Sequence, residues 1–583
     1  MAVLSIATAL LAFSFVPPED VKRWVDGSSP DGNARQFPLE RVKGMLDRSR
    51  ALGLTYLGAG LALGAWFREI CGWIVALGTA ASQLLSRWMR ALGTFATAER
   101  PHALALSLIS LVALALRVRF LGQDMRADES MTALQFAARP LAYGLSDYMA
   151  PNNHLFNTLC VHVCIALFGD SPESIRLPAL VFGTLLVPAT YGAVRSLANK
   201  HAALLAATLV TCSPYLIHYS ANARGYTFVA LVFMLLVSLM AWLQRESNLA
   251  AWTLAAALSA LGFFAIPTML YPFGICLTWF ALDALSTRSK PIIVMRARQL
   301  LALGGATIVL ATILYTPVLV VSGPASVAAN EFVVPTAMPL LLEQLARRTA
   351  DVASGAILSA PILALALLIP GLLLSVVWHR AVSRQRVPIL LATLLWCGFV
   401  LVAQRAAPFG RVWTFLLPLL LGASAIGVVE LGRRVITDRL SSEAAAAAAS
   451  GLFVALVGGP WVVNLLSTGS PGSFSDSGRC ADAPAAAQFA KLHLSRNERI
   501  LTALPARPIL AYYARAVGLP DEMTSTEPGG RPYTMVLADR PITELNESLI
   551  ADELPTLVES DLELVREFSD TRLYRIDPPL VDR

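Results

Sequence analysis

Two adjacent carboxylates stand just after an apolar run of the chain. Residues 120–140 read FLGQDMRADESMTALQFAARP and contain Asp128 and Glu129. A charge next to the hydrocarbon core is costly and usually marks a functional site or a solvated interface. Neighbouring residues on a helix point about 100° apart, so one carboxylate can face a cavity while the other braces it. A carboxylate in this position suits a general base for an incoming hydroxyl; plain solvation of the loop is the alternative.

Cationic and polar side chains head other apolar runs. The segment SPYLIHYSANARGYTFVAL (213–231) joins two runs through a very short loop, and a guanidinium in that loop is a strong partner for phosphate. A second segment, DYMAPNNHLFNTL (147–159), supplies amide and imidazole groups suited to phosphate or sugar hydroxyls. Interface anchors and an ordinary turn are the alternatives. The candidate donor-binding residues are Asn153, His154, Arg224, Tyr226 and Arg411.

The elements that must position these residues are membrane helices. The chain has 583 residues, of which 56% are hydrophobic and 15% are charged, whereas soluble domains are about a quarter charged. Runs such as residues 227–243 have the length that a bilayer demands. We therefore expect an all-α polytopic membrane protein without nucleic-acid binding, because no basic face or known motif is present. Eleven core spans are expected, centred near residues 110, 186, 209, 235, 257, 275, 311, 367, 395, 421 and 455.

Three zones follow from the hydropathy. Residues 1–100 form an N-terminal extension whose runs 51–66 and 70–86 suggest a membrane hairpin, with amphipathic surface helices as the alternative. Residues 101–466 form the membrane module. Residues 467–583 are more polar and predict a small α/β domain, with strands in 498–504, 533–539 and 571–577 and helices in 484–494 and 555–568. The first 17 residues fit an uncleaved anchor or an interfacial helix, and a cleaved signal peptide stays open.

The distribution of Lys and Arg orients the spans. One set of loops, 195–201, 244–248, 284–299, 379–386 and 430–443, carries 13 basic residues in 50. The opposite set carries 8 in 105. Because cytoplasmic loops are rich in Lys and Arg, the first set is predicted to be cytoplasmic. This assignment treats the short run 154–169 as a juxtamembrane helix, and it places Asp128, Glu129 and the C-terminal domain outside the cytoplasm.

The cysteines suggest neither a disulfide framework nor a metal site. Seven are present, most of them within apolar runs, and no CxxC spacing occurs. A buried Cys in such a run behaves as a small hydrophobe. Arginines can neutralise a phosphate, so a metal ion is not required. We therefore expect no metal ligands and no cofactor, and a divalent metal ion stays open as the alternative.

The order of these motifs resembles that of the GT-C glycosyltransferases, near family 39 and the bacterial proteins similar to protein O-mannosyltransferases. RADES follows the first core span, PNNHLFNTL comes next, and NARGY opens a later span, so that the resemblance covers about residues 103–245. It implies that Asp128 is the presumed base, that Glu129 is the second residue of the acid pair, and that Arg224 and Tyr226 form an Arg-x-Tyr at the site. Relatives often carry an acid two residues before that arginine, where this chain has Asn222.

The resemblance implies an enzyme of the bacterial cytoplasmic membrane that transfers a hexosyl or pentosyl group. The expected donor is a polyprenyl-phosphate sugar, the acceptor is a hydroxyl of a glycan, lipid or protein of the cell envelope, and transfer inverts the anomeric centre at the outer face. Two alternatives stay open: a flippase for lipid-linked sugars, and an inactive relative that acts in envelope assembly. A flippase needs polar groups deep in the bilayer, and such groups are scarce in this sequence.

Overall fold

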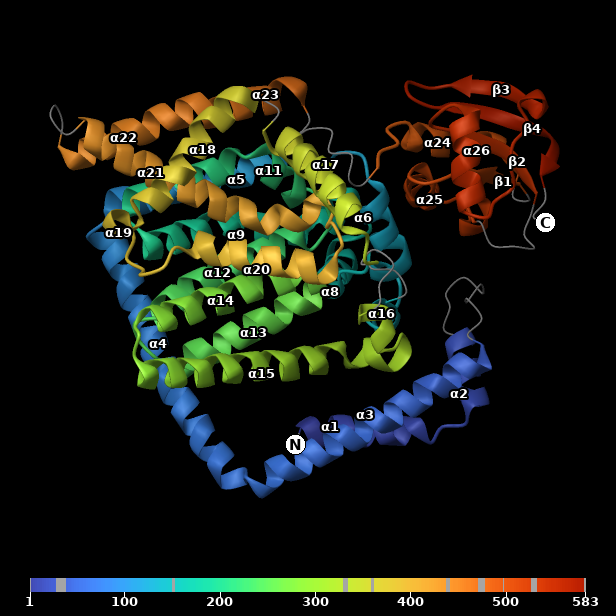
Figure 1. Cartoon of the computed structure of the whole chain (residues 1–583). Coiled ribbons are helices and arrows are strands. Elements are labelled where there is room, and N and C mark those ends of the chain that lie inside the picture. Colours follow the sequence, from blue (N-terminus) through green and yellow to red (C-terminus); the bar gives the residue numbers. More distant parts are fainter. Residues whose placement is uncertain are drawn as a thin grey trace. The chain divides into compact units, whose positions relative to one another are not determined.

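The computed structural model describes residues 2–27, 38–148, 152–328, 334–357, 361–436, 441–469, 478–495, 498–525 and 532–580. Most of these residues are helical, and a small sheet lies near the C-terminus (Figure 1). The chain divides into two compact units. The first comprises Met1–Phe120, Ala142–Leu159 and Pro178–Gly472, and the second comprises Leu121–Leu141, Cys160–Leu177 and Ser473–Arg583. The C-terminal residues thus group with two segments from the middle of the chain.

Each of the eleven predicted span centres lies within a helical segment. A lipid environment requires every backbone N–H and C=O to be satisfied internally, which apolar runs achieve as helices. Within the described residues, seven helices are long and apolar enough to cross a membrane, or nine if two bent pairs each count as one span. The segments are α5 (Arg100–Val118), α9 (Pro172–Leu197), α10 (Lys200–Cys212), α12 (Tyr226–Leu243), α13 (Leu249–Ala265), α14 (Leu270–Ser286), α15 (Lys290–Val321), α18 (Pro361–Val377), α20 (Ile389–Gln404), α21 (Leu416–Ile436), and α22 (Ser442–Phe453) with α23 (Gly459–Thr468).

Helix α12 is the central helix of the first unit, since 83% of its apolar window is buried. It packs against α13, α14 and α21. Helices α5 and α15 bury only 11% and 22% of theirs and therefore lie at the periphery. The residues at the start of α12 are consequently attached to the best-packed helix among these spans.

A sharp corner precedes α12. Helix α10 is followed by α11 (Pro214–Ser220) at a bend of 64°. Ser213 caps α11 by accepting a hydrogen bond from the N–H of Leu216, and Pro214 occupies the first turn, where its missing N–H costs nothing. The fully buried Arg117 of α5 holds this corner by donating to Ser220 Oγ at 3.1 Å and to the Val210 carbonyl at 3.2 Å.

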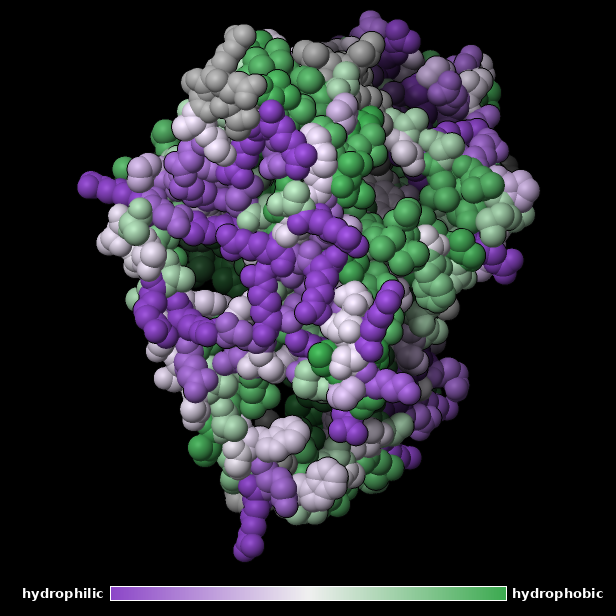
Figure 2. Space-filling view, turned by 60° about the vertical axis from the view of Figure 1, so that its left-hand side comes forward, coloured by the Kyte–Doolittle hydropathy of each residue, from purple (hydrophilic) through white to green (hydrophobic). Residues whose placement is uncertain are grey.

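The loops predicted to be cytoplasmic lie together on one side of the first unit. The Leu197 carbonyl accepts from the N–H of Arg384 at 2.8 Å, and Arg245 donates to the Arg384 carbonyl at 3.0 Å. Arg296 donates to Gln244, and Lys200 forms an ion pair with Glu443 at 3.1 Å. These contacts connect all five loops of the basic set. The face turned forward in Figure 2 carries a band of hydrophilic side chains bordered by hydrophobic surface.

The N-terminal extension is helical throughout its described part. Its helices are α1 (Ala2–Ser14), α2 (Pro18–Gly27), α3 (Leu39–Ala65) and α4 (Phe67–Thr97). Helices α1 and α2 meet at a bend of 100°, and together they pass the hydropathy test for a bent span. Neither α3 nor α4 is among the candidate spans, although α4 exposes apolar side chains such as Trp73 and Ile74. The hairpin expected from 51–66 and 70–86 therefore appears as two longer helices, α3 and α4.

The remaining described helices are short or irregular. Helix α8, at 14 residues, is too short to cross a bilayer, in agreement with the juxtamembrane reading of 154–169. Helix α17 covers most of the loop 330–348, whose first residues lie outside the described part of the chain. These elements are α6 (Ala127–Thr132), α7 (Leu141–Gly144), α8 (Leu155–Phe168), α16 (Pro324–Ala328), α17 (Met338–Ile357) and α19 (His379–Val382).

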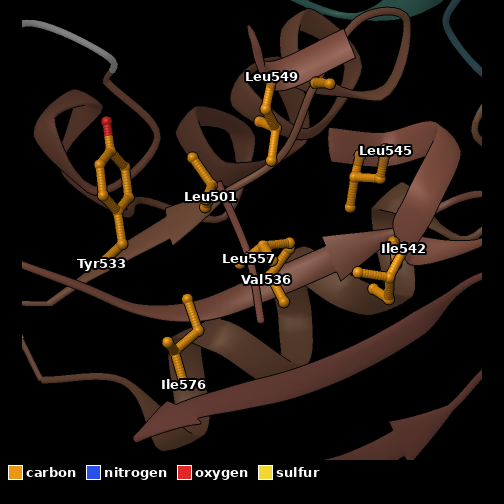
Figure 3. Packing of buried hydrophobic residues seen from close by; sticks show 10 residues of the cluster. Leu501, Tyr533, Val536, Ile542, Leu545, Leu549, Leu557 and Ile576 are labelled. Carbon is orange, nitrogen blue, oxygen red and sulfur yellow. The ribbon is translucent and has the colours of Figure 1, made fainter. Parts of the chain in front are cut away.

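The C-terminal part of the second unit is a four-stranded sheet with three helices. Strand β1 pairs with β2 in parallel, and the pairs β2–β4 and β4–β3 are antiparallel, giving the order β1-β2-β4-β3. Its core includes Leu501, Val536, Leu545, Leu549 and Ile576, which Figure 3 shows between the sheet and α26. The elements are α24 (Ala483–His493), β1 (Arg499–Leu501), α25 (Ala506–Ala516), β2 (Tyr533–Ala538), α26 (Ile542–Ala551), β3 (Leu562–Glu567) and β4 (Arg572–Leu580).

The three predicted strands and the helix expected in 484–494 are confirmed. The helix expected in 555–568 is wrong, because this segment contains a short 3-10 turn and strand β3. Leu562 faces Ile576 across the ladder and Leu564 faces Tyr574, so that the period-two alternation of apolar residues, and pairing with β4, decide its structure.

Candidate functional site

The acid pair lies in the second unit, in the first turn of α6. Glu129 is fully buried, and its carboxylate accepts a hydrogen bond from the backbone N–H of Arg126 at 2.9 Å. Arg126 is the N-cap of α6, so Glu129 satisfies one of the N–H groups that a helix start leaves without an intrahelical partner. The sequence signature for this arrangement is an acid three residues after the N-cap.

Arg176, in the first turns of α9, holds the loop that precedes α6. Its Nε donates to Glu129 Oε2 at 3.0 Å, and its Nη2 pairs with Glu129 Oε1. Its other N–H groups donate to the carbonyls of Leu121, Gln123 and Asp124. All five donors of the guanidinium are therefore used, and the side chain is 1% exposed. The segment 121–129, here called the acid loop, is fixed by one arginine.

Asp128 differs from Glu129 in its exposure. It is half-buried, while Glu129 is fully enclosed. The Asp128 carbonyl accepts from the Thr132 hydroxyl at 2.9 Å, which ties its backbone into α6. Asp128 is therefore the less enclosed acid of the pair, although its Oδ2 atom is itself buried.

Arg224 is the centre of a second cluster, in the first unit, which we call the arginine cluster. It lies in the loop between α11 and α12 and is 3% exposed. Its Nη1 donates to the Asn152 carbonyl at 2.8 Å and to the Asn152 side chain. Its Nη2 lies 3.1 Å from Nε2 of His154. The structure therefore brings together two of the predicted donor-binding residues, Arg224 and His154.

The hydrogen bonds of His154 leave two donors facing each other. The backbone N–H of Gly225 lies 3.0 Å from His154 Nδ1, and we assign Nδ1 as the acceptor of the ring from this contact. A neutral imidazole has one acceptor nitrogen, and its other nitrogen then carries the proton. The N–H at Nε2 consequently points into the same space as the Nη2 donor of Arg224. An anionic oxygen placed there would accept from both groups.

His154 is held neutral by its surroundings. Burial is the main cause, and the positive charges of Arg224 and Arg411 act in the same direction, so that the pKa of His154 lies well below its usual value of 6.5. Arg411 lies in a 3-10 turn (Gly410–Phe415) before α21, and its guanidinium stacks over the Phe409 ring at 4.7 Å. Arg411 therefore acts on the arginine cluster through its positive charge.

Aromatic rings surround the cluster. The Tyr226 ring contacts the His154 ring edge-on, with centroids 5.1 Å apart and an interplanar angle of 88°. Tyr219 packs on Tyr226 at 5.4 Å, and the Arg224 guanidinium lies 5.9 Å from the Tyr226 centroid. These rings exclude water and lower the local dielectric, which strengthens the electrostatic effect of the cations.

Asn153 stabilises a turn through its side-chain hydrogen bonds. Its amide nitrogen donates to the Gly144 and Asp147 carbonyls at 2.8 and 2.7 Å, and its amide oxygen accepts from the Thr158 hydroxyl at 2.7 Å. Both N–H groups are thereby used, and the side chain is fully buried. It holds the turn that presents Asn152 and His154 to Arg224.

Asn222 has a side chain whose hydrogen-bonding capacity is unused. It is 1% exposed, and neither its amide nitrogen nor its amide oxygen has a partner within the described residues. Its backbone carbonyl accepts from the N–H of Arg224 at 2.7 Å, so it belongs to the same loop. A buried amide without partners costs about 1–3 kcal/mol per group, and a ligand that supplies both a donor and an acceptor would remove that cost.

Sequence reasoning missed Arg176, the main partner of the acid pair. The available signal was an arginine next to a long apolar run, where an ionisable residue normally has a partner. In the described part of the chain, no three His, Cys, Asp or Glu side chains gather in a geometry that could hold a metal ion.

Comparison with known proteins agrees with this architecture. A family model described as dolichyl-phosphate-mannose-protein mannosyltransferase matches residues 155–320, a stretch that contains Arg224 and Tyr226 but begins after the acid loop. Relative to the expected stretch 103–245, the match is shifted toward the C-terminus. No curated protein matches the sequence.

Solved structures share the fold. ArnT from Cupriavidus metallidurans in the apo state aligns with a TM-score of 0.53 at 16% identity, over 82% of this chain and 98% of ArnT. The same protein bound to undecaprenyl phosphate gives 0.49 at 15% identity, over 80% and 97%. The oligosaccharyltransferase AglB from Archaeoglobus fulgidus, in complex with an inhibitory peptide and a dolichol-phosphate, gives 0.41 at 13% identity, over 67% and 58%.

The chain has the fold of a multi-pass GT-C membrane protein, and a family model of that class matches residues 155–320. Its architecture is the ArnT-like form of that fold. The resemblance predicted from the order of the sequence motifs is thereby confirmed.

Proposed function

We propose that this protein transfers a sugar from a polyprenyl-phosphate donor to a hydroxyl acceptor at the outer face of the bacterial cytoplasmic membrane. The observation that carries the proposal is the pair of converging donors, Arg224 Nη2 and His154 Nε2, beside a further cation, Arg411. The name of the matching family refers to a dolichyl-phosphate sugar donor, which is consistent with an anionic group at this cluster.

The arginine cluster binds the phosphate of the donor in this proposal. Arg224 and the Nε2–H of His154 share one phosphate oxygen, and Arg411 adds a long-range positive charge. Tyr226 orients the His154 ring through its edge-on contact. Donors that are fixed before the reaction stabilise the charge that develops on the departing phosphate, which is usually a large part of catalysis. Asn153 acts indirectly, by holding the turn that carries Asn152 and His154.

Asp128 is the general base. The acceptor oxygen attacks the anomeric carbon of the sugar while the bond between that carbon and the phosphate oxygen breaks. The electron pair of the broken bond stays on the phosphate, and the acceptor proton moves to the Asp128 carboxylate. A single displacement of this kind inverts the anomeric centre. Glu129 braces α6 through Arg176 and Arg126 and takes no part in proton transfer.

The outer-face location rests on the charge bias of the loops. The five loops of the basic set lie together on one side of the first unit, and basic loops face the cytoplasm. In this proposal the C-terminal domain lies outside the cytoplasm, and the acceptor is a hydroxyl of an envelope glycan, lipid or protein. The transferred group is a hexosyl or pentosyl residue.

The test incubates purified protein in lipid nanodiscs with a radiolabelled polyprenyl-phosphate sugar and a cell-envelope extract. We expect free polyprenyl phosphate and a labelled acceptor that is not extracted with the lipid. If the donor crosses the bilayer of proteoliposomes without cleavage, the protein is a flippase instead. If correctly folded protein carries out neither reaction, the result would support a role in envelope assembly.

A further inference from the structure

One helix of the C-terminal domain contacts the acid loop within the second unit. Helix α25 packs against α6, and the hydroxyl oxygen of Tyr513 accepts a hydrogen bond from the backbone N–H of Met125 at 3.0 Å. Met125 is 1% exposed and immediately precedes Arg126, the N-cap of α6. The two partners are 388 positions apart in the sequence. The domain therefore supplies an acceptor to a buried backbone donor of the acid loop.

Tyr512, next to Tyr513, contacts the turn that precedes α9, the helix that carries Arg176. The hydroxyl of Tyr512 donates to Asp170 Oδ1 at 3.4 Å, in the turn between α8 and α9. The rings of Tyr512 and Tyr513 meet edge-on, with centroids 5.5 Å apart. Arg176 links α9 to the acid loop, and this tyrosine pair links α25 to both segments. Burial raises the pKa of Tyr513, so its hydroxyl stays neutral.

The entry to the C-terminal domain also lies against α6. Gly478 has a φ of +62°, and a Cβ at this position would lie 2.1 Å from Pro505 Cβ and 3.6 Å from Ala127 Cβ. Only glycine fits this close approach without displacing a neighbour. Ala127 is the first residue of α6. The chain at Gly478 thus lies close to the start of α6, in addition to the packing of α25 on that helix.

Helix α6 needs such support, because its six residues and the π-helical turn that continues it (Ala133–Ala137) form only a short helical segment. Isolated helices shorter than about 12 residues are marginal in water. We propose that the C-terminal domain positions the acid loop. Tyr513 fixes Met125, and Tyr513 and Arg176 together set the orientation in which α6 presents Asp128. This inference rests on the proposed function for its catalytic meaning, while the positioning itself can be measured without turnover.

The test compares Tyr513→Phe with the wild-type protein by hydrogen exchange and by kinetics. The substitution keeps the ring and removes the acceptor of the Met125 N–H. Because a buried donor then lacks a partner, we expect the amides of residues 125–132 to exchange about tenfold faster. We expect kcat to fall by about five- to tenfold with the KM for the lipid donor unchanged, since the arginine cluster is intact.

Two further variants separate positioning from general destabilisation. Tyr574→Phe makes the same change on strand β4 and should leave both the exchange of residues 125–132 and kcat as in the wild type. Tyr512→Phe removes a longer hydrogen bond, and its effect on kcat should be about twofold. Wild-type exchange of residues 125–132 in Tyr513→Phe would overturn the inference. If exchange rises but no variant, nor the wild type, transfers sugar, the proposed function fails and the positioning contact stands.

Discussion

The acid loop and the arginine cluster satisfy their buried polar groups in opposite ways. In the acid loop, the buried ions Glu129 and Arg176 are paired, and all five donors of Arg176 have protein acceptors. In the arginine cluster, Arg224 and His154 direct donors toward one another, and the amide of Asn222 has no partner within the described residues. In the first region the buried ion pair is closed within the protein, and it holds the backbone of the loop. We propose that the second region is completed by a ligand.

We propose that the two regions have different roles in catalysis. A base must be held in one orientation relative to the proton it accepts, and catalytic geometry is lost with displacements of about 1 Å. A phosphate site must instead offer donors that have no better partner in the free protein. The variants below test this contrast, in order of decreasing expected effect.

Removing the central cation of the arginine cluster should have the largest effect. We expect Arg224→Ala to lower kcat/KM by about 100-fold or more, because the loss of one fixed donor to a developing anion typically costs that much. The exposed Arg298 of α15 offers a matched control, and Arg298→Ala should keep wild-type kinetics. Binding of polyprenyl phosphate measured by thermal shift should be lost in the first variant only. Retained binding in Arg224→Ala would remove it from the phosphate site.

Breaking the ion pair of the acid loop should act mainly on stability. Glu129→Gln leaves Arg176 as a buried cation without a full counter-charge, which typically costs about 3–5 kcal/mol. The exposed pair Glu343–Arg347 provides the control, since Glu343→Gln should cost less than about 1 kcal/mol. Thermal unfolding in detergent measures both. Equal unfolding temperatures for the two variants would contradict the bracing role of Glu129.

The pH dependence of the protein's stability should depend on His154. Because the folded-state pKa of His154 lies well below 6.5, the unfolded chain binds a proton that the folded chain refuses as the pH falls below 6.5. The free energy of unfolding should therefore decline below pH 6.5, and this decline should be shallower in His154→Gln. Chemical denaturation between pH 5 and 7.5 compares the two proteins. A parallel pH dependence would show that His154 is not the group involved.

Substitutions of Asn222 should show whether the bound group is negatively or positively charged. Asn222→Asp adds a carboxylate two residues from Arg224, so it should repel an anionic donor and raise its KM by about three- to tenfold. Asn222→Ala removes the amide without adding charge and should raise KM less. A lower KM in Asn222→Asp would point to a cationic group or a metal ion at this position instead of a phosphate.

Much of the membrane architecture could be predicted because hydropathy is a local property. All eleven span centres lie in helical segments, and the short run before α9 is a juxtamembrane-length helix. The failure at 555–568 arose where a mixed apolar and acidic pattern fitted a helix, while pairing with β4 was decisive. Long-range partners, not local sequence, determined that segment.

The sequence singled out members of each cluster but not their long-range partners. The pairing of Arg224 with His154 joins two motifs that were singled out separately. Arg176, 47 positions from Glu129, and Tyr513, 388 positions from Met125, were not singled out, because neither belongs to a motif near its partner. Asn153 was expected to contact the donor, whereas its three hydrogen bonds place it within a turn.

The central claim is that Asp128 takes the acceptor proton while Arg224 and His154 hold the phosphate. It is tested most directly by single-turnover transfer from a pre-bound polyprenyl-phosphate sugar in Asp128→Asn. The account predicts that donor affinity stays as in the wild type and that the rate of transfer falls by at least about 100-fold. A single-turnover rate close to that of the wild-type protein, with donor bound, would contradict it.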